Sequence, residues 1–259
     1  MKRYIQIGEH IFQINSSSIR IMNLFEENFH IVVDTQNPHM VIDMEDGYGV
    51  PFINHDVEIT KEENSICYLR ADYCIEVDDV FTTAWVRVHN GFALKHALMN
   101  LYSSFIVYNE WGLLIHSSCV IEDGQAHIFA GRSGAGKSTA AKLSSPRVLL
   151  SDEASIVKID GDEVTVFNSP FRSELEATHS SESKLLASIQ LLVQDLENSR
   201  LRISQVDSLL QLLDKVFYWT CDAEELNRIF ALLKQLVRIT PVFELHFQKN
   251  HTFWELITS

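Results

Sequence analysis

The amino-acid sequence predicts an α/β (α+β) protein in which a β-rich region precedes a larger domain with a mixed sheet. Three observations support this fold class. Short apolar runs of strand length recur in residues 1–90, and a segment with helical periodicity follows them. A strand, a glycine-rich loop and a helix follow one another in residues 126–143. We therefore predict two domains, residues 1–90 and residues 91–259, with no flexible linker between them.

The composition is that of a globular protein with a sizeable core. The 259 residues include 35 acidic and 21 basic side chains, and the net charge of −14 argues against binding to nucleic acid or to an anionic membrane surface. No apolar run reaches transmembrane length, and the N-terminal residues lack the apolar stretch of a signal peptide. We expect a cytoplasmic protein with free thiols at its four cysteines, Cys67, Cys74, Cys119 and Cys221.

Strand-like runs characterise the N-terminal region, which is the predicted site of substrate recognition. The clearest of them are residues 11–14, 30–33, 66–69 and 84–88. From Phe92 to Tyr108 the period changes, and apolar residues mark one face of a helix whose start is expected at residues 90–91.

An Asp-Gly pair at residues 123–124 predicts a two-residue hairpin between strands 113–121 and 126–130. These strands are then antiparallel, whereas strands around glycine loops of this kind are more often parallel and joined by helices. The turn also fixes the register, because residues whose numbers add to 247 face each other. This register places His116 opposite Gly131, at the entrance to the glycine loop, and makes His116 a candidate site residue.

Residues 131–139 match the pattern G-x-x-x-x-G-K-[ST] of a phosphate-binding P-loop. Glycines allow backbone angles that a side chain would block, so that successive N–H groups can face phosphate oxygens. In this pattern Lys137 reaches the β- and γ-phosphates and the Ser138 hydroxyl is a Mg²⁺ ligand. The predicted nucleotide-binding residues are Gly131, Arg132, Ser133, Gly134, Ala135, Gly136, Lys137, Ser138 and Thr139. The motif predicts binding of a nucleoside triphosphate, and it does not identify the reaction.

A second candidate motif follows the loop. Residues 147–151 form a short apolar strand that ends in Asp152 and Glu153. A carboxylate at the end of a strand after a P-loop is typical of the metal-binding second motif of nucleotide enzymes. Further along, Arg172 is a candidate for stabilising transition-state charge, with an exposed surface arginine as the alternative.

The C-terminal part is predicted to be mainly helical. A plain hairpin is expected in residues 156–167, and a helix that opens at Ser204 has an apolar face running from Leu209 through Leu210 to Phe217. Residues 222–225 resemble a capping box before a second helix, and an alternating strand follows Pro241. We expect the leucines of these helices to lie in the core.

Residues 114–118, the hairpin, the P-loop and residues 149–153 together resemble the C-terminal catalytic domain of HPr kinase/phosphorylase. That family places a histidine on the strand before its P-loop and a pair of aspartates on the strand after it. The resemblance is specific over residues 113–153 and weaker through residues 168–171 and the helices beyond. It implies a P-loop domain with a mixed sheet of the type found in HPr kinase and in phosphoenolpyruvate carboxykinase. Because HPr kinases are oligomers, it also implies self-association.

Two positions depart from the family pattern. Glu153 stands where the family has aspartate, and Thr139 stands where it usually has glutamate. A segment matching the one implicated in phosphorolysis is not recognisable, which favours the forward kinase reaction. The combination is similar to stand-alone kinases that phosphorylate the C-terminal serine of lasso-peptide precursors. It implies that ATP and Mg²⁺ are bound and that a peptide or protein serine accepts the phosphoryl group.

In this interpretation each candidate residue has a role. Lys137 binds the phosphates, and Asp152 orients the serine hydroxyl and accepts its proton, with Arg172 supplying further positive charge. The metal ligands are Ser138, Glu153 and Asp152, and the roles of the two carboxylates are exchangeable. His116 positions the transferring group or relays a proton.

Two other classes of function fit the same motifs. One is a P-loop ATPase with water as the acceptor, or a nucleotide-binding regulatory protein that has lost catalysis. The other is a kinase for a small molecule such as a free amino acid. The β-rich region favours a larger substrate, since a peptide can add as a strand to an exposed sheet edge.

Overall fold

The structure, a computed structural model, describes residues 1–33, 37–173, 182–220 and 222–258, so Cys221 lies outside the described residues. The described residues form two compact units. The first contains residues 1–33, 37–108, 218–220 and 222–226, and the second contains residues 109–173, 182–217 and 227–258. The sequence predicts a boundary near residue 90, whereas in the structure the helix of residues 91–108 groups with the first unit because it packs against two strands there.

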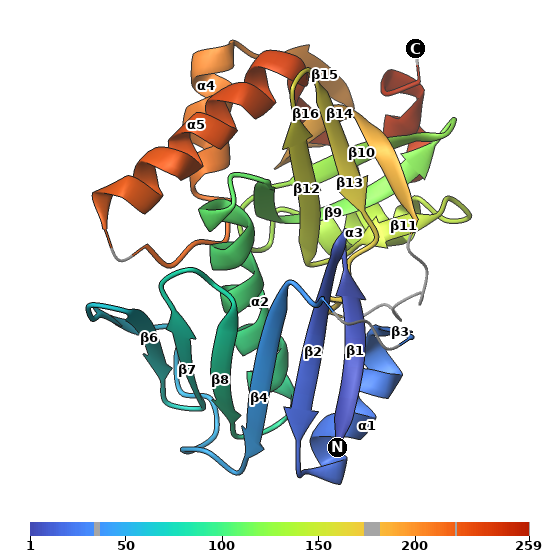
Figure 1. Cartoon of the computed structure of the whole chain (residues 1–259). Helices are drawn as coiled ribbons and strands as arrows, with labels where there is room; N and C mark the ends of the chain where they lie inside the picture. Colours follow the sequence, from blue (N-terminus) through green and yellow to red (C-terminus); the bar gives the residue numbers. More distant parts are fainter. Residues whose placement is uncertain (34–36, 174–181, 221, 259) are drawn as a thin grey trace. The chain divides into compact units, whose positions relative to one another are not determined.

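The first unit is a mixed sheet with two helices (Figure 1). Its strands lie in the order β3-β1-β2-β4-β8-β7-β6-β5. The pairs β2–β4 and β4–β8 are parallel, and the other neighbours are antiparallel. The elements are β1 Lys2–Ile7, β2 His10–Ser16, α1 Ile19–Asn28, β3 His30–Val32, β4 Met40–Asp46, β5 Glu58–Lys61, β6 Ser65–Arg70, β7 Tyr73–Asp78, β8 Thr83–Val88 and α2 Gly91–Tyr108.

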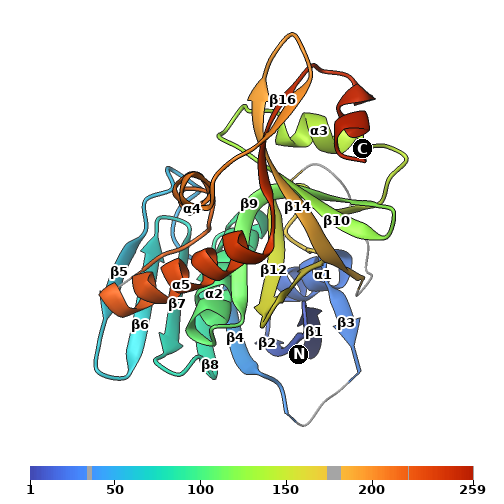
Figure 2. The same ribbon diagram turned by 90° about the horizontal axis from the view of Figure 1, so that it is seen from above.

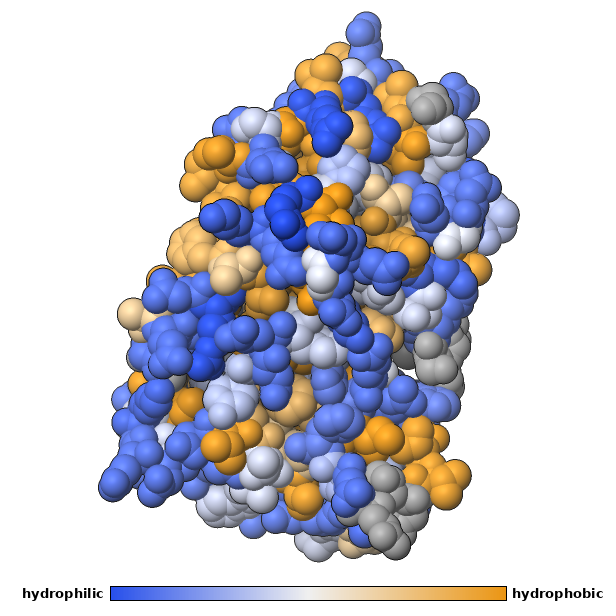
Figure 3. Space-filling view, turned by 45° about the horizontal axis from the view of Figure 1, so that its top comes forward, coloured by the Kyte–Doolittle hydropathy of each residue, from blue (hydrophilic) through white to orange (hydrophobic). Residues whose placement is uncertain are grey.

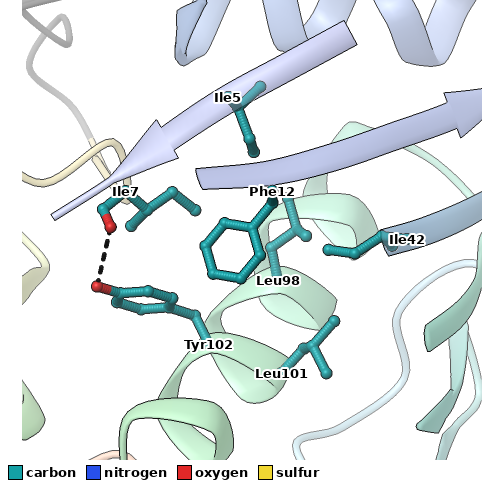
Figure 4. Close-up of a pocket in the computed structure, with 7 residues that line it drawn as sticks. All are labelled: Ile5, Ile7, Phe12, Ile42, Leu98, Leu101 and Tyr102. Carbon is teal, nitrogen blue, oxygen red and sulfur yellow. Dashed lines mark hydrogen bonds between the residues drawn. The ribbon is translucent and has the colours of Figure 1, made fainter. Parts of the chain in front are cut away.

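Helix α2 closes the core of the first unit. Figure 4 shows apolar side chains from β1, β2 and β4 beside those of α2, and these residues are Ile5, Ile7, Phe12, Ile42, Leu98, Leu101 and Tyr102. The cavity between them measures about 10 Å³, which is at the lower limit for one water molecule. The Tyr102 hydroxyl donates to the carbonyl oxygen of Ile7 at 3.1 Å. This region is therefore packed core and not a ligand site.

The second unit has eight described strands, in the order β10-β9-β12-β13-β14-β16-β15, with β11 paired to β9. Strand β14 also pairs with β10 in parallel, so the pairings β10–β9–β12–β13–β14 return to β10 (Figure 2). The strands are β9 Gly112–Glu122, β10 Gln125–Ala130, β11 Leu149–Ser151, β12 Ala154–Asp160, β13 Glu163–Phe167, β14 Ser183–Gln194, β15 Ser199–Arg202 and β16 Val242–Phe247. The helices are α3 Lys137–Leu143, α4 Gln205–Leu213, α5 Ala223–Ile239, which begins in the first unit, and the 3₁₀ helix η1 His251–Leu256.

The predicted hairpin is confirmed. Asp123 and Gly124 have φ angles of 48° and 77°, and two positive φ angles are what a type I′ hairpin turn requires. The ladder runs from Gln125 opposite Glu122 to Ala130 opposite Ser117, which is the predicted register. The mixed α/β fold class is likewise confirmed.

Two expectations for the helix α4 are wrong. The helix ends at Leu213 and does not reach Phe217, because the backbone N–H of Phe217 donates instead to the carbonyl of Leu114 on β9 at 2.8 Å. Leu210 was expected in the core, but it is 63% exposed. The predicted start is confirmed, since the Ser204 hydroxyl accepts from the N–H of Asp207.

The exposed surface carries both hydrophobic and hydrophilic residues. Figure 3 shows hydrophobic residues in several groups among hydrophilic ones on the face that it draws. Among the described residues, no helix combines the length and the apolar character needed to cross a membrane.

Candidate functional site

A glycine loop, residues 131–136, connects the end of β10 to the start of α3. Gly134 and Gly136 have φ angles of 79° and 110°, which residues other than glycine rarely adopt. A Cβ atom on Gly136 would lie 2.7 Å from Cζ of Phe247, and one on Gly131 would lie 2.7 Å from Cβ of Ala135. The three glycines are therefore needed for backbone angle, for space, or for both.

Hydrogen bonds and core packing hold the glycine loop in place. The N–H of Ala135 donates to the carbonyl of Arg132 at 3.0 Å, and the amide of Gln194 donates to the carbonyl of Gly134 at 2.7 Å. Gln194 is the last residue of β14, which runs parallel to β10, so the carboxyl ends of both strands meet at the loop. Ala135 packs against a core that includes Phe129 and Phe247. The end of β14 and the core that contains Phe129 and Phe247 thus support the loop backbone.

Lys137 is the first residue of α3, and only 8% of it is exposed. Its ammonium donates to the carbonyl oxygens of Gly131 at 3.0 Å and Arg132 at 3.3 Å. Burial, and then the charge of Lys215, lower the pKa of Lys137. The sequence-predicted lysine is therefore held at the glycine loop by the loop's own carbonyl groups.

His116 lies on β9. It is the residue next to Ser117, whose pair with Ala130 is the last of the β9–β10 ladder counted from the turn. Its backbone pairs with Ala154 of β12, and its N–H donates to the carbonyl of Lys215 at 2.7 Å. Burial lowers the pKa of His116 to about 4, with further contributions from the charges of Lys137 and Lys215. The imidazole is therefore neutral at pH 7 and lies within the electrostatic reach of both lysines.

Asp152 and Glu153 lie between β11 and β12, which both pair antiparallel with β9. The pairing of β11 with β9 is irregular just before these two residues, because its register shifts between Leu149 and Ser151. Asp152 is only 3% exposed, and its two carboxylate oxygens accept from the N–H and the hydroxyl of Ser173, each at 3.1 Å. The structure thus holds the Asp152 carboxylate in one orientation.

Buried hydroxyl groups join β9, which carries His116, to β11 and β12, the strands on either side of Asp152. The Ser117 hydroxyl donates to that of Ser155 at 2.7 Å, and the Ser155 hydroxyl also bonds that of Ser151. The N–H of Ser117 donates to the carbonyl of Glu153 at 3.1 Å. These bonds join β9 to residues on both sides of Asp152, so the strand that carries His116 and the carboxylate pair are positioned together.

Arg172 is largely buried, unlike the exposed surface arginine that was the alternative. Its guanidinium donates to the carbonyls of Leu149 and Leu150 at 3.1 and 3.0 Å, and to the carbonyl of Ser169 at 2.9 Å. A fourth bond reaches the Asn168 side chain at 2.7 Å. Burial lowers the pKa of Arg172, and the charge of Asp152 opposes this effect. The contacts place Arg172 as a brace for the end of β11, next to Asp152.

A cleft of about 610 Å³ opens beside the glycine loop. This volume falls within the usual range for small-molecule sites. The lining residues come from the loop, the end of β14, the helix α4 and the two residues after it: Gly131, Arg132, Ser133, Gly134, Ala135, Leu191, Leu192, Val193, Gln194, Leu210, Gln211, Asp214 and Lys215.

Lys215 is a candidate functional residue that the sequence does not indicate. Only 7% of it is exposed, although it lines the cleft. No sequence motif surrounds it. Its place depends on the pairing of residues 215–217 with β9, which joins segments about a hundred residues apart.

Comparison with known proteins gives a match to a protein-family model. The family model described as "SynChlorMet cassette protein ScmC" matches residues 89–259, a range that contains the glycine loop, His116, Asp152 and Lys215. No curated protein matches the chain significantly.

Proposed function

The chain belongs to the ScmC family of SynChlorMet cassette proteins, and we propose, from its motifs and its cleft, that it is an ATP-dependent serine kinase of the HPr kinase-like type. The acceptor in this proposal is a serine on a ribosomally made precursor peptide. The observation that carries the proposal is the cleft of about 610 Å³, which the glycine loop lines and beside which Lys137 is held. The neutral His116 lies on β9 and is bonded to Lys215 of the cleft wall, and the buried Asp152 directly follows β11, which pairs with β9.

Several features of the cleft suit a nucleoside triphosphate. Gly134 and Gly136 give the loop backbone angles that turn N–H groups towards a bound anion. The cleft lies beyond the carboxyl ends of two parallel strands, β10 and β14, where α/β sheets commonly bind nucleotides. ATP supplies the phosphoryl group when it is bound, and Lys137 is the cation that we assign to the phosphates.

The residues also suit Mg²⁺ as part of a shared site. Among the described residues, no group of three or more His, Cys, Asp and Glu side chains can hold a metal ion by itself. Mg²⁺ usually takes one or two carboxylates, several waters and substrate phosphates. Ser138, Asp152 and Glu153 match such a partial set, and we assign them as the protein ligands. The ion neutralises phosphate charge when it is bound.

Asp152 is the proposed general base. Its carboxylate, oriented by Ser173, accepts the proton as the O–H bond of the acceptor serine breaks. The serine oxygen bonds to the γ-phosphorus, the bond from that phosphorus to its bridging oxygen breaks, and ADP leaves. His116 is neutral at pH 7, so its role here is to make a hydrogen bond to the transferring group and not to supply charge.

The acceptor is the least constrained part of the proposal. Residues 1–108 contain 15 acidic and 7 basic side chains, which favours a neutral or basic peptide. The family name describes a cassette protein, so the genes beside the one for this chain are the first source of candidate peptides. A short open reading frame whose product contains a serine is the substrate to test first.

The test is incubation of the protein with ATP, Mg²⁺ and each candidate peptide, followed by mass spectrometry and an assay for ADP. We expect one peptide to gain the mass of a phosphoryl group. Lys137→Ala should abolish transfer and nucleotide binding, and Asp152→Asn should abolish transfer while ATP still binds. Lys234→Ala, on the exposed side of α5, is the matched control and should behave as the wild type.

Each alternative function has its own outcome. ADP formed without any phosphorylated peptide would favour an ATPase, and phosphorylation of a free amino acid would favour a small-molecule kinase. Wild-type turnover by Asp152→Asn would refute the assignment of the base. Wild-type turnover by His116→Ala would remove His116 from the site. No detectable ATP binding would refute the proposal as a whole.

A further inference from the structure

Lys215 reaches the cleft from a segment that the glycine-loop motif does not include. The carbonyl of Lys215 accepts from the N–H of His116, and Phe217 donates its N–H to Leu114, so residues 215–217 run beside β9. An isolated bridge between Ile115 and Val216 completes this pairing. The backbone of Lys215 is therefore fixed to the strand that carries His116.

The side chain of Lys215 forms an ion pair with the residue that precedes it. Only 7% of the residue is exposed, and its ammonium bonds the carboxylate of the neighbouring Asp214. The Asp214 side chain is itself 62% exposed. Water already solvates much of the Asp214 carboxylate, which can therefore remain charged without Lys215, so an anion that enters the cleft can replace Asp214 as the partner of Lys215.

Two lysines from different segments thus act on the same small region. The ammonium of Lys137 bonds the carbonyl oxygens of Gly131 and Arg132, and these two residues line the cleft that Lys215 also lines. Two like charges in a partly buried site are costly unless an anion compensates them. A ligand with several negative charges would relieve this repulsion, whereas a neutral ligand would leave it.

We propose that Lys215 is a second phosphate-binding residue, which exchanges its bond to Asp214 for a phosphate oxygen when a polyphosphate occupies the cleft. Lys137 and Lys215 then bind the same phosphate chain from two separate segments. This inference rests on the proposed function only in taking the polyphosphate to be that of ATP. In a transfer reaction Lys215 would also stabilise the charge on the moving phosphoryl group.

The binding experiment uses inorganic tripolyphosphate and ATP as separate probes, with titration calorimetry on the full chain. Lys215→Met keeps most of the aliphatic stem and removes the charge, and we expect it to weaken the binding of both probes about 10- to 100-fold. Lys215→Arg should recover most of the affinity. Asp214→Asn should leave affinity unchanged or raise it, because it removes a competitor, and Lys234→Ala should have no effect.

A second measurement does not depend on any ligand. In Lys215→Met the pKa of His116, followed by nuclear magnetic resonance, should rise from its value of about 4, because one neighbouring positive charge is lost. An unchanged pKa would show that the ammonium is not near His116 and would overturn the inference. Circular dichroism would verify that the variant is folded.

The outcomes separate this inference from the proposed function. If the wild type phosphorylates a peptide and Lys215→Met does so with unchanged kcat, KM and tripolyphosphate affinity, the inference is wrong and the kinase proposal stands. If both probes bind in the predicted way and no acceptor is phosphorylated, the inference stands and the kinase proposal fails. A loss of kcat on the order of 10²-fold in Lys215→Met, with a smaller change in KM, supports both. If the wild type binds neither probe, both are wrong.

Discussion

Replacement of Gly136 by alanine tests the structural account of the glycine loop. Gly136 has a φ angle of 110°, and a left-handed conformation costs a residue with a side chain about 1–2 kcal/mol. The new Cβ would also lie 2.7 Å from Cζ and 3.3 Å from Cε1 of Phe247. Phe247 is buried and packs against Phe253, so its ring cannot move aside freely, and overpacking of this kind costs about 1–3 kcal/mol. We expect Gly136→Ala to lower the free energy of unfolding by about 2–5 kcal/mol.

Gly134 provides the matched control, since it lies in the same loop. Its φ angle is 79°, but a Cβ atom there meets no heavy atom within 4 Å. Gly134→Ala should therefore cost only the backbone contribution of about 1–2 kcal/mol. The difference between the two variants measures the contact with Phe247.

The assay is urea denaturation followed by circular dichroism, with the free energy of unfolding taken from each curve. The double variant Gly136→Ala/Phe247→Leu replaces the obstructing ring with a smaller side chain. Its free energy of unfolding should exceed the value expected from adding the two single changes by about 0.5–3 kcal/mol. Equal stability of Gly136→Ala and Gly134→Ala would refute the reasoning, and so would strict additivity in the double variant.

Two further predictions concern buried charge. Burial lowers the pKa of His96 to about 3 and those of His116 and His127 to about 4, so the folded protein keeps these side chains neutral while the unfolded chain protonates them below about pH 6.5. The free energy of unfolding should be highest above that pH and should fall towards pH 4, because at pH 5 these three histidines take up about three protons when the chain unfolds. Urea denaturation measured across this pH range checks this, and a free energy that does not change with pH would contradict it. Asp72→Ala leaves the buried Arg70 guanidinium without the carboxylate that lies 2.6 Å away, so thermal unfolding should show a loss of about 3–5 kcal/mol, and a loss below about 1 kcal/mol would count against this account.

Features with local signals could be predicted from the sequence. The hairpin at residues 123–124 needs only two residues that accept positive φ, and the glycine loop needs residues that are adjacent in the chain. The start of α4 follows from the hydrogen bond of Ser204 to the N–H of Asp207. In the N-terminal region four of eight strands were recognised, while α1 was missed because a short helix among strands gives a weak periodic signal.

Features that depend on distant pairing could not be predicted. Strand β14 pairs in parallel with β10 across some 60 residues, and nothing local indicates that partner. The same reason hides Lys215, whose position follows from the pairing of residues 215–217 with β9. The exposure of Leu210 has a related cause, since it borders the cleft and is not covered by another element. The candidate site was thus found where its residues are close in sequence and missed where they come from a later segment.

The grouping of residues 218–226 with the first unit affects the order in which the chain can fold during synthesis. Asp222 caps α5 through the N–H of Glu225 and pairs with Lys61 at 2.5 Å. Residues 1–108 leave the ribosome first, but this partner of Lys61 emerges only after residues 109–217 have been made. At typical elongation rates that interval is on the order of ten seconds. The N-terminal unit must therefore persist in an incomplete form while most of the second unit is synthesised, and a nascent chain arrested before residue 218 would contain a first unit that lacks its last segment.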